Sequence, residues 1–211
     1  MPAKTRHPHN RNDTRRDEIL DTALEVFAPN GYLGTTTDML AKEAAISKQT
    51  LYKYFGDKDG VFAALVHRAC ERVVDPFAPL VDEMQTIASA EQAVRKLADQ
   101  FVGAIMNPDI QKLRRLVIAE APRFPDLAEE YWQSGFGRML VSLADCFAVL
   151  HQRQLLHVSD TELAAQHFAG MMLWIPGNRA MFNVSEPMLD RDDIANIIST
   201  GSAAFLRAYA H

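Results

Sequence analysis

The sequence predicts an all-α fold of about nine helices, in which an N-terminal three-helix unit precedes a longer helical part. Apolar residues return every three or four positions in most segments, as they do in helices that pack through one face. No segment alternates apolar and polar residues with comparable regularity, so a β-sheet is not expected. The chain has 211 residues and is 48% apolar, which is enough for a substantial buried core.

The first helix is expected from Asp13 to Ala28. Ile19, Ala23 and Phe27 recur at four-residue spacing and would face the core. The segment from Pro29 to Gly31 should end this helix, because proline and glycine are unfavourable in a helix interior.

Two short helices joined by a tight turn are expected between Thr35 and Lys58, which is a helix-turn-helix arrangement. Thr36 or Thr37 can cap the first of them, because a hydroxyl oxygen accepts a hydrogen bond from an unpaired backbone N–H. Ser47 can cap the second in the same way. This second helix should run from Lys48 to Phe55.

The second helix of this pair has two chemically different faces. At about 100° per residue, Leu51 and Phe55 point inward, and the opposite face presents amide, hydroxyl, ammonium and phenol groups. Such groups can read base edges in a major groove and hold phosphates, although a solvated helix face is the simpler alternative. The candidate DNA-contacting residues are Thr37, Ser47, Lys48, Gln49, Thr50, Tyr52, Lys53, Tyr54 and Lys58.

The segment GYLGTTTDMLAKEAAISKQTLYKYFGDKDGVFAAL resembles the DNA-binding signature of TetR-type transcriptional regulators. The resemblance covers roughly residues 14–66. It rests on the Gly31-Tyr32 corner, the Ala41–Ala44 helix, the Ser47-Lys48 opening and the Leu51–Phe55 segment. It implies a regulator that binds double-stranded operator DNA, most simply a repressor on a palindromic site.

Ala45 departs from the pattern of that family, which usually has glycine in this turn. The position often requires a left-handed backbone, where a residue other than glycine costs about 1 kcal/mol. We therefore expect either a strained Ala45 or an adjusted turn.

Charge and helix pattern together divide the chain into three predicted parts. The net charge is −5, yet residues 1–16 alone have a net charge of +4. A basic tail of this kind can lie on phosphates or enter a minor groove, or it can simply aid solubility. The charge pattern indicates a basic flexible tail over 1–12. Together with the helix pattern, the resemblance implies a helix-turn-helix DNA-binding domain over 13–58 and a helical ligand-binding and dimerisation domain over 59–211.

A fourth helix, from Asp57 to Asp75, should connect the DNA-binding unit to the rest and is the natural lever between them. Pro76 and Pro79 then interrupt the pattern. Gly135 and Gly137 are expected to kink or thin a later, long helix. The later helices are expected over 89–106, from 108 to before Pro122, over 126–151, from 159 or 160 to 174 with Pro176-Gly177 closing it, and from about 190.

The resemblance also implies a small-molecule cavity among the C-terminal helices and a homodimer formed by the last two. Residues 114–132 resemble the C-terminal domain of an AefR-like branch of the family. The aromatic and Met side chains suit an apolar or aromatic effector, although a stripe of such residues can equally be plain core. The candidate ligand-binding residues are Phe101, Met106, Trp132, Phe136, Met139, His167, Met171 and Trp174. Gly170 and Gly201 can allow close helix crossing in the dimer or ordinary packing within one subunit.

The sequence gives little support to other functional classes. Cys70 and Cys146 are isolated and fit no metal spacing, and no catalytic motif, metal site or cofactor site is expected. No apolar run is long enough to span a membrane, and a cytoplasmic location follows as an expectation. The alternatives that remain are a constitutive DNA-binding regulator without an inducer and an all-helical enzyme acting on a small molecule.

Overall fold

The computed structural model describes residues 11–72, 75–182 and 190–210, and in these residues it contains helices and no strand. The expectation of an all-α fold is confirmed. The predicted tail lies outside the described residues except for Arg11 and Asn12, which begin the first helix. The helical elements are α1 (Arg11–Gly34), α2 (Thr37–Glu43), α3 (Lys48–Phe55), α4 (Lys58–Arg72), α5 (Ala78–Met84), α6 (Ala90–Ile105), α7 (Pro108–Glu120), α8 (Pro125–Trp132), the π-helical turn η1 (Gln133–Gly137), α9 (Arg138–Gln152), α10 (Thr161–Met181) and α11 (Arg191–Tyr209).

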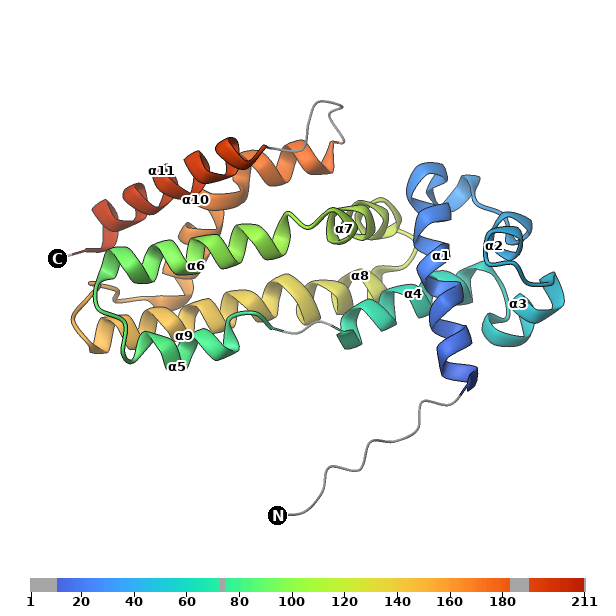
Figure 1. Ribbon diagram of the computed structural model, residues 1–211, viewed down its shortest axis with the longest axis horizontal. Helices are drawn as coiled ribbons and strands as arrows, with labels where there is room; N and C mark the ends of the chain where they lie inside the picture. The colour runs from blue at the N-terminus through green and yellow to red at the C-terminus, as the bar shows by residue number, and fades with distance from the viewer. Residues whose placement is uncertain (1–10, 73–74, 183–189, 211) are drawn as a thin grey trace, which may run out of the picture.

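The helices form an elongated molecule with α1 to α4 gathered at one end (Figure 1). At the other end lie α5, α6, α9, α10 and α11, and α7 and α8 lie between the two groups. The recognition-helix candidate α3 is therefore at the far end of the molecule from the end of α11.

The first helix does not stop at Ala28 as expected. It continues through Pro29, bends at Gly31, whose φ of 66° is left-handed, and makes a last turn to Gly34. Pro29 has no N–H, so one carbonyl of the preceding turn loses its helical partner. Next to it, the Asn30 side-chain amide donates to the Val26 carbonyl oxygen at 2.8 Å, one turn earlier in the helix.

The short helix α5 was not expected, because Pro76 and Pro79 interrupt the sequence pattern there. Pro79 lies in the first turn of α5, where a missing N–H costs nothing because that donor has no helical partner. Phe77, Leu80 and Met84 are buried and attach α5 to the core.

The long helix expected over 126–151 is observed as α8, η1 and α9 in unbroken succession. The expected irregularity at Gly135 and Gly137 is confirmed as the π-helical turn. A Cβ atom at Gly137 would lie 3.2 Å from the Trp132 carbonyl oxygen, so glycine makes room for the wider turn.

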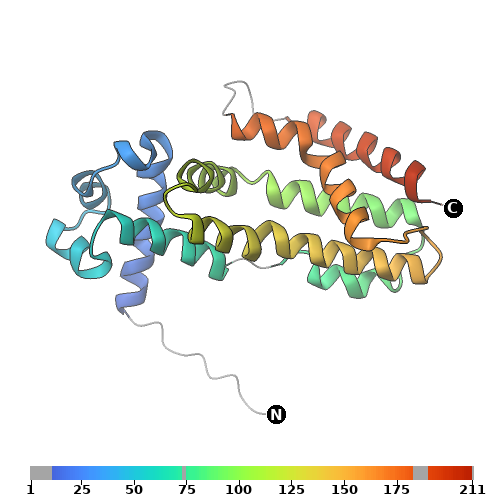
Figure 2. The same ribbon diagram turned by 180° about the vertical axis from the view of Figure 1, so that it is seen from behind.

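The expected end of α10 at Trp174 is wrong, because the helix continues through Pro176 and Gly177 to Met181. Pro176 cannot donate to the Met172 carbonyl, and the helix is bent rather than broken, as Figure 2 shows. Both Pro176 and Gly177 are buried, so packing holds the helix together where local propensity would end it.

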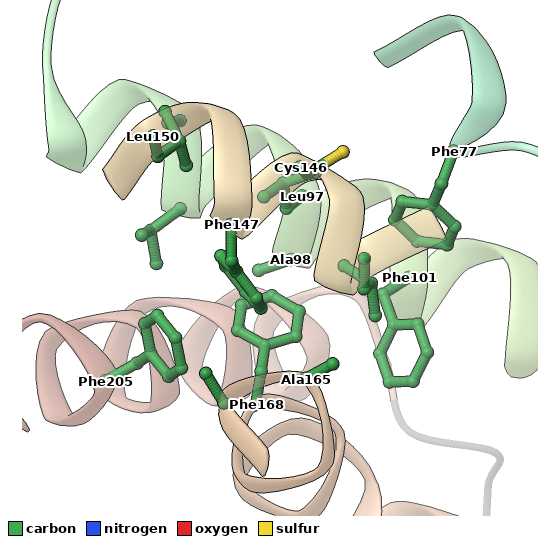
Figure 3. Close-up of a cluster of buried hydrophobic side chains, with 14 of the residues drawn as sticks. Phe77, Leu97, Ala98, Phe101, Cys146, Phe147, Leu150, Ala165, Phe168 and Phe205 are labelled. Carbon is green, nitrogen blue, oxygen red and sulfur yellow. The ribbon is translucent and has the colours of Figure 1, made fainter. Parts of the chain in front are cut away.

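Two apolar clusters form the core. The larger one joins α5, α6, α9, α10 and α11, and in Figure 3 the rings of Phe101, Phe147, Phe168 and Phe205 gather at its centre. The Phe147 and Phe168 ring centroids are 5.5 Å apart. The other cluster joins α1 to α4 with α7, and α8 packs against it. The division of the chain at residue 58 stays a prediction.

Leu97→Ala should lower the free energy of unfolding by about 2–5 kcal/mol, because it leaves a cavity in the larger cluster. Leu97 is 0% exposed, whereas Leu33 is 78% exposed, so Leu33→Ala is the matched control and should change stability by about 0.5 kcal/mol or less. Urea denaturation at one protein concentration measures both. Similar losses for the two variants would contradict this placement of the core.

Candidate nucleic-acid interface and cavity

Hydroxyl side chains begin both helices of the helix-turn-helix. Thr36 Oγ1 accepts a hydrogen bond from the Met39 N–H at 3.2 Å, which settles the choice between the two candidate threonines. Ser47 Oγ accepts one from the Thr50 N–H at 3.1 Å, as expected. The caps fix where α2 and α3 start and so fix which side chains face outward.

The turn between α2 and α3 contains the left-handed residue expected from the sequence. Ala45 has a φ of 50° and is exposed. Its N–H donates to the Lys42 carbonyl at 3.1 Å, and the Ile46 N–H donates to the Ala41 carbonyl at 3.0 Å. These bonds hold Ala45 in a conformation that alanine alone disfavours.

The inner face of α3 is held by Leu51, which is fully buried, and by the half-buried Phe55. The other face is open: Ser47, Lys48, Gln49, Tyr52 and Lys53 are exposed, and Thr37, Thr50, Tyr54 and Lys58 are half-buried. The structure thus gathers the candidate DNA-contacting residues on and beside α3. Their contact with DNA remains a prediction.

Several of these side chains already bond to one another. Ser47 Oγ lies 2.8 Å from Thr50 Oγ1, and Thr37 Oγ1 lies 3.4 Å from the Tyr52 hydroxyl. Lys48 Nζ forms an ion pair with Asp38 at 2.8 Å, and this hydrogen bond raises the pKa of Lys48. A phosphate bound by Lys48 would have to share or replace Asp38.

Lys58 has a structural task in the free protein. Its Nζ donates to the carbonyl oxygens of Tyr32 and Thr35 at 2.8 and 2.9 Å. It also lies 4.2 Å from the centroid of the Tyr32 ring, a cation–π distance. Lys58 therefore ties the start of α4 to the end of α1, and its proposed phosphate contact would compete with these bonds.

Tyr32 is buried at the meeting point of three parts of the chain. Its hydroxyl donates a hydrogen bond to Asp59 on α4. Burial raises the pKa of Tyr32, and this hydrogen bond raises it further. Its ring packs edge-on against Phe62 and Phe124, with centroids 5.5 and 5.3 Å away. Phe124 precedes α8, so Tyr32 joins the helix-turn-helix to the segment that enters the C-terminal helices.

The other end of α4 is clamped to α1 by charges. Arg68, although buried, bonds through Nη1 to the Asp17 carbonyl at 2.7 Å and to the Asp21 carboxylate at 2.8 Å. Arg72 pairs with Asp17 at 2.5 Å. The two helices are thereby fixed to each other at both ends.

A cavity of about 550 Å³ lies between α7, α8, η1, α9 and α10. Its size is within the usual range for small-molecule sites. Of the candidate ligand-binding residues, Trp132, Phe136 and Trp174 line it, and their contact with a ligand stays a prediction. The remaining lining residues were not predicted: Arg114, Leu140, Gln166, Ala169, Gly170, Leu173, Gly177, Asn178 and Met181.

The structure places the other five candidates elsewhere. Phe101 and Met139 are buried in the larger apolar cluster, and Met106 packs against it. Met171 is exposed and does not line the cavity, and His167 Nδ1 bonds to the Tyr209 hydroxyl at 2.6 Å. Helical spacing cannot separate a core stripe from a cavity wall, since both present large apolar side chains on one face.

Arg114 is the one charged residue that the described part of the chain contributes to the cavity lining. It is half-buried, and burial lowers the pKa of its guanidinium. The nearby Tyr131 has its pKa raised to about 12 by burial, so its phenol stays neutral and provides no counterion. A sequence signal for Arg114 existed: it lies on α7 between the buried Leu113 and Leu116, where a charge faces away from the core stripe.

The described residues contain no cluster of three or more His, Cys, Asp or Glu that could hold a metal ion. In the same part of the chain, no helix combines the length and the apolar character that a membrane crossing requires.

Two family models match the chain and together span most of it. Residues 19–65 match the model of bacterial regulatory proteins of the tetR family. Residues 92–211 match the model of the AefR-like transcriptional repressor C-terminal domain.

Solved structures and a curated relative agree with these matches. A protein from Mesorhizobium loti assigned to the TetR family of transcriptional regulators is 34% identical, with 96% of this chain and 100% of that one covered and a TM-score of 0.83. The flavonoid-responsive regulator FrrA is 25% identical over 93% of this chain and 97% of its own, with a TM-score of 0.65. The uncharacterized HTH-type transcriptional regulator YezE of Bacillus subtilis is 28% identical over 70% of this chain and 75% of its own length.

Ala45→Gly should stabilise the fold by a few tenths of a kcal/mol to about 1 kcal/mol. The substitution removes the left-handed strain. Part of the gain in stability is lost, because glycine raises the conformational entropy of the unfolded chain. Ala44→Gly is the matched control, because Ala44 has a φ of −75° and should lose about 1 kcal/mol. Thermal unfolding compares the two, and equal destabilisation would show that the turn is not strained.

Proposed function

This chain belongs to the TetR family of bacterial transcriptional regulators, and we propose that it is a dimeric repressor that a small molecule releases from a palindromic operator. The observation that carries this proposal is the outer face of α3, which stands at one end of the molecule with its polar groups directed away from the core. Such a regulator would act in the cytoplasm, on the bacterial chromosome.

The α3 surface has the chemistry of a helix that enters a major groove. Gln49 is exposed and carries an amide that can both donate to and accept from a base edge. Around it, the hydroxyls of Ser47, Thr50 and Tyr52 and the ammonium of Lys53 suit phosphate oxygens on either side. We therefore assign Gln49 to reading a base edge. Its neighbours are assigned to positioning the helix on the DNA through phosphate contacts.

Exposed apolar side chains on α10 and at its C-cap support a homodimer formed through α10 and α11. Trp174, Ile175 and Phe182 are 70%, 62% and 77% exposed, which is costly for a monomer in water. Gly201 does not serve the dimer, since its backbone packs on Met172 of the same chain, where an added Cβ would lie 2.9 Å from Sδ. Gly170 lines the cavity, and the open space beside it belongs to that site rather than to the dimer.

The position of the cavity supports control by a small apolar or aromatic effector. FrrA, which shares this fold, is named as responsive to flavonoids, and the aromatic wall here suits a ligand of related character. The cavity includes Trp132 at the end of α8, and α8 packs through Leu127 and Tyr131 against the cluster that contains α4. A ligand that displaced α8 would therefore move α4, which we assign as the lever to the DNA-binding unit.

Gln49→Ala should weaken binding to the preferred duplex about tenfold or more and leave binding to random DNA nearly unchanged, because a base-edge bond is worth about 1–3 kcal/mol. Lys53→Ala, its control on the same helix, should weaken both duplexes alike and reduce the salt slope by about 1 per subunit. Fluorescence anisotropy over a range of salt concentrations measures both variants. Equal losses on both duplexes for Gln49→Ala would remove the base-reading role.

The wild-type chain should sediment as a dimer at micromolar concentration, and Ile175→Glu should shift it toward monomer. A carboxylate in a closed apolar interface costs several kcal/mol unless it is paired. Val141→Glu is the control, because Val141 on α9 is equally exposed, at 63%. A monomeric wild type, or equal dissociation of both variants, would refute the assigned interface.

A further inference from the structure

The cavity combines an apolar wall with one cation. Trp132, Phe136 and Leu140 supply aromatic and aliphatic surface from η1 and its flanking helices, and the lining contributed by the described residues includes no Asp or Glu. Gln166 and Asn178 are the neutral amides of the lining. Of the described residues in the wall, Arg114 is therefore the one that a charged group on a ligand would meet.

Arg114 makes no hydrogen bond or ion pair with the residues that the structure describes. The other cations of α7 differ from it: Lys112 pairs with Glu25 at 2.9 Å, and Arg115 donates to the Ala180 carbonyl at 3.0 Å. The guanidinium of Arg114 lies beside α10, where a Cβ atom on Gly177 would be 3.7 Å from Nη1. Arg114 is thus set against the bent part of α10, and its guanidinium has no hydrogen-bond or ion-pair partner among the described residues.

The half-buried guanidinium of Arg114 keeps its charge, because arginine is not deprotonated in proteins. Burial without a partner is unfavourable for a charged group, and a ligand that supplies the missing acceptor recovers that cost. A carboxylate or sulfonate can accept two parallel N–H bonds from one guanidinium, which makes such a pair both strong and directional.

We infer that the cavity binds an organic anion, with an acidic group on Arg114 and an aromatic or aliphatic body against Trp132, Phe136 and Leu140. This inference rests on the proposed function only in taking the cavity as the effector site. It narrows the effector from any apolar molecule to an amphipathic acid.

Two fluorescent probes that differ by a single sulfonate test the inference directly. They are 1-anilinonaphthalene-8-sulfonate and its uncharged parent, N-phenyl-1-naphthylamine. The full-length wild type should bind the sulfonate at least about tenfold more tightly than Arg114→Met does, since a charge-assisted bond is lost. The affinity for the uncharged parent should change less than threefold between these two proteins.

Two further variants make the result specific to Arg114. Arg138→Met removes an exposed cation that does not line the cavity, and it should bind both probes as the wild type does. Arg114→Lys keeps the charge and should retain part of the preference for the sulfonate. Circular dichroism establishes that each variant is folded, and the lysine variant provides the test if the methionine variant is not.

The possible outcomes separate the ligand class from the regulatory role. Sulfonate binding that is absent, or that is insensitive to Arg114, overturns the inference even if another molecule releases DNA. Sulfonate binding that depends on Arg114 upholds it, and adding the probe to the protein–DNA complex then tests release separately. Bound probe with no effect on DNA affinity would count against ligand control of DNA binding and leave the assigned ligand class intact.

Discussion

The burial of Tyr32 is the contact on which the arrangement of this molecule depends. Its ring is the place where the end of α1, the start of α4 and the segment before α8 meet, through Phe62 and Phe124. Lys58 binds the carbonyl oxygen of Tyr32 and Asp59 binds its hydroxyl, so one residue makes both polar and apolar contacts at this junction. Because α2 and α3 lie between α1 and α4 in the chain, this junction fixes the base on which the recognition helix stands.

Helix α7 gives that junction a connection to the cavity. Leu113, Leu116 and Val117 are buried in the cluster of the DNA-binding unit, whereas Arg114 lines the cavity and Arg115 bonds to the end of α10. One helix therefore contacts both regions through different faces. Packed side chains of α7 thus connect the cavity wall with the cluster that contains α1 and α4.

The sequence was sufficient where local chemistry decides the structure. The Ser47 cap, the left-handed Ala45 and the two faces of α3 follow from hydroxyl bonding, backbone sterics and helical spacing, and each is observed. It was insufficient where packing overrides local preference. The helix through Pro176 persists because Pro176 and Gly177 are themselves buried, and α5 forms because Pro79 falls in a first turn. Most cavity residues could not be predicted, since their common location arises only when α7, α9 and α10 pack together.

The central claim is that α3 reads a defined DNA sequence as one half of a symmetric pair. Selection of bound duplexes from a random library by the purified chain tests this claim most directly. The account predicts enrichment of an inverted repeat bound by a dimer, with half-site centres about 34–36 Å apart, or one helical turn. No enrichment, with weak binding that depends wholly on salt, would contradict it and would leave α3 as a structural helix only.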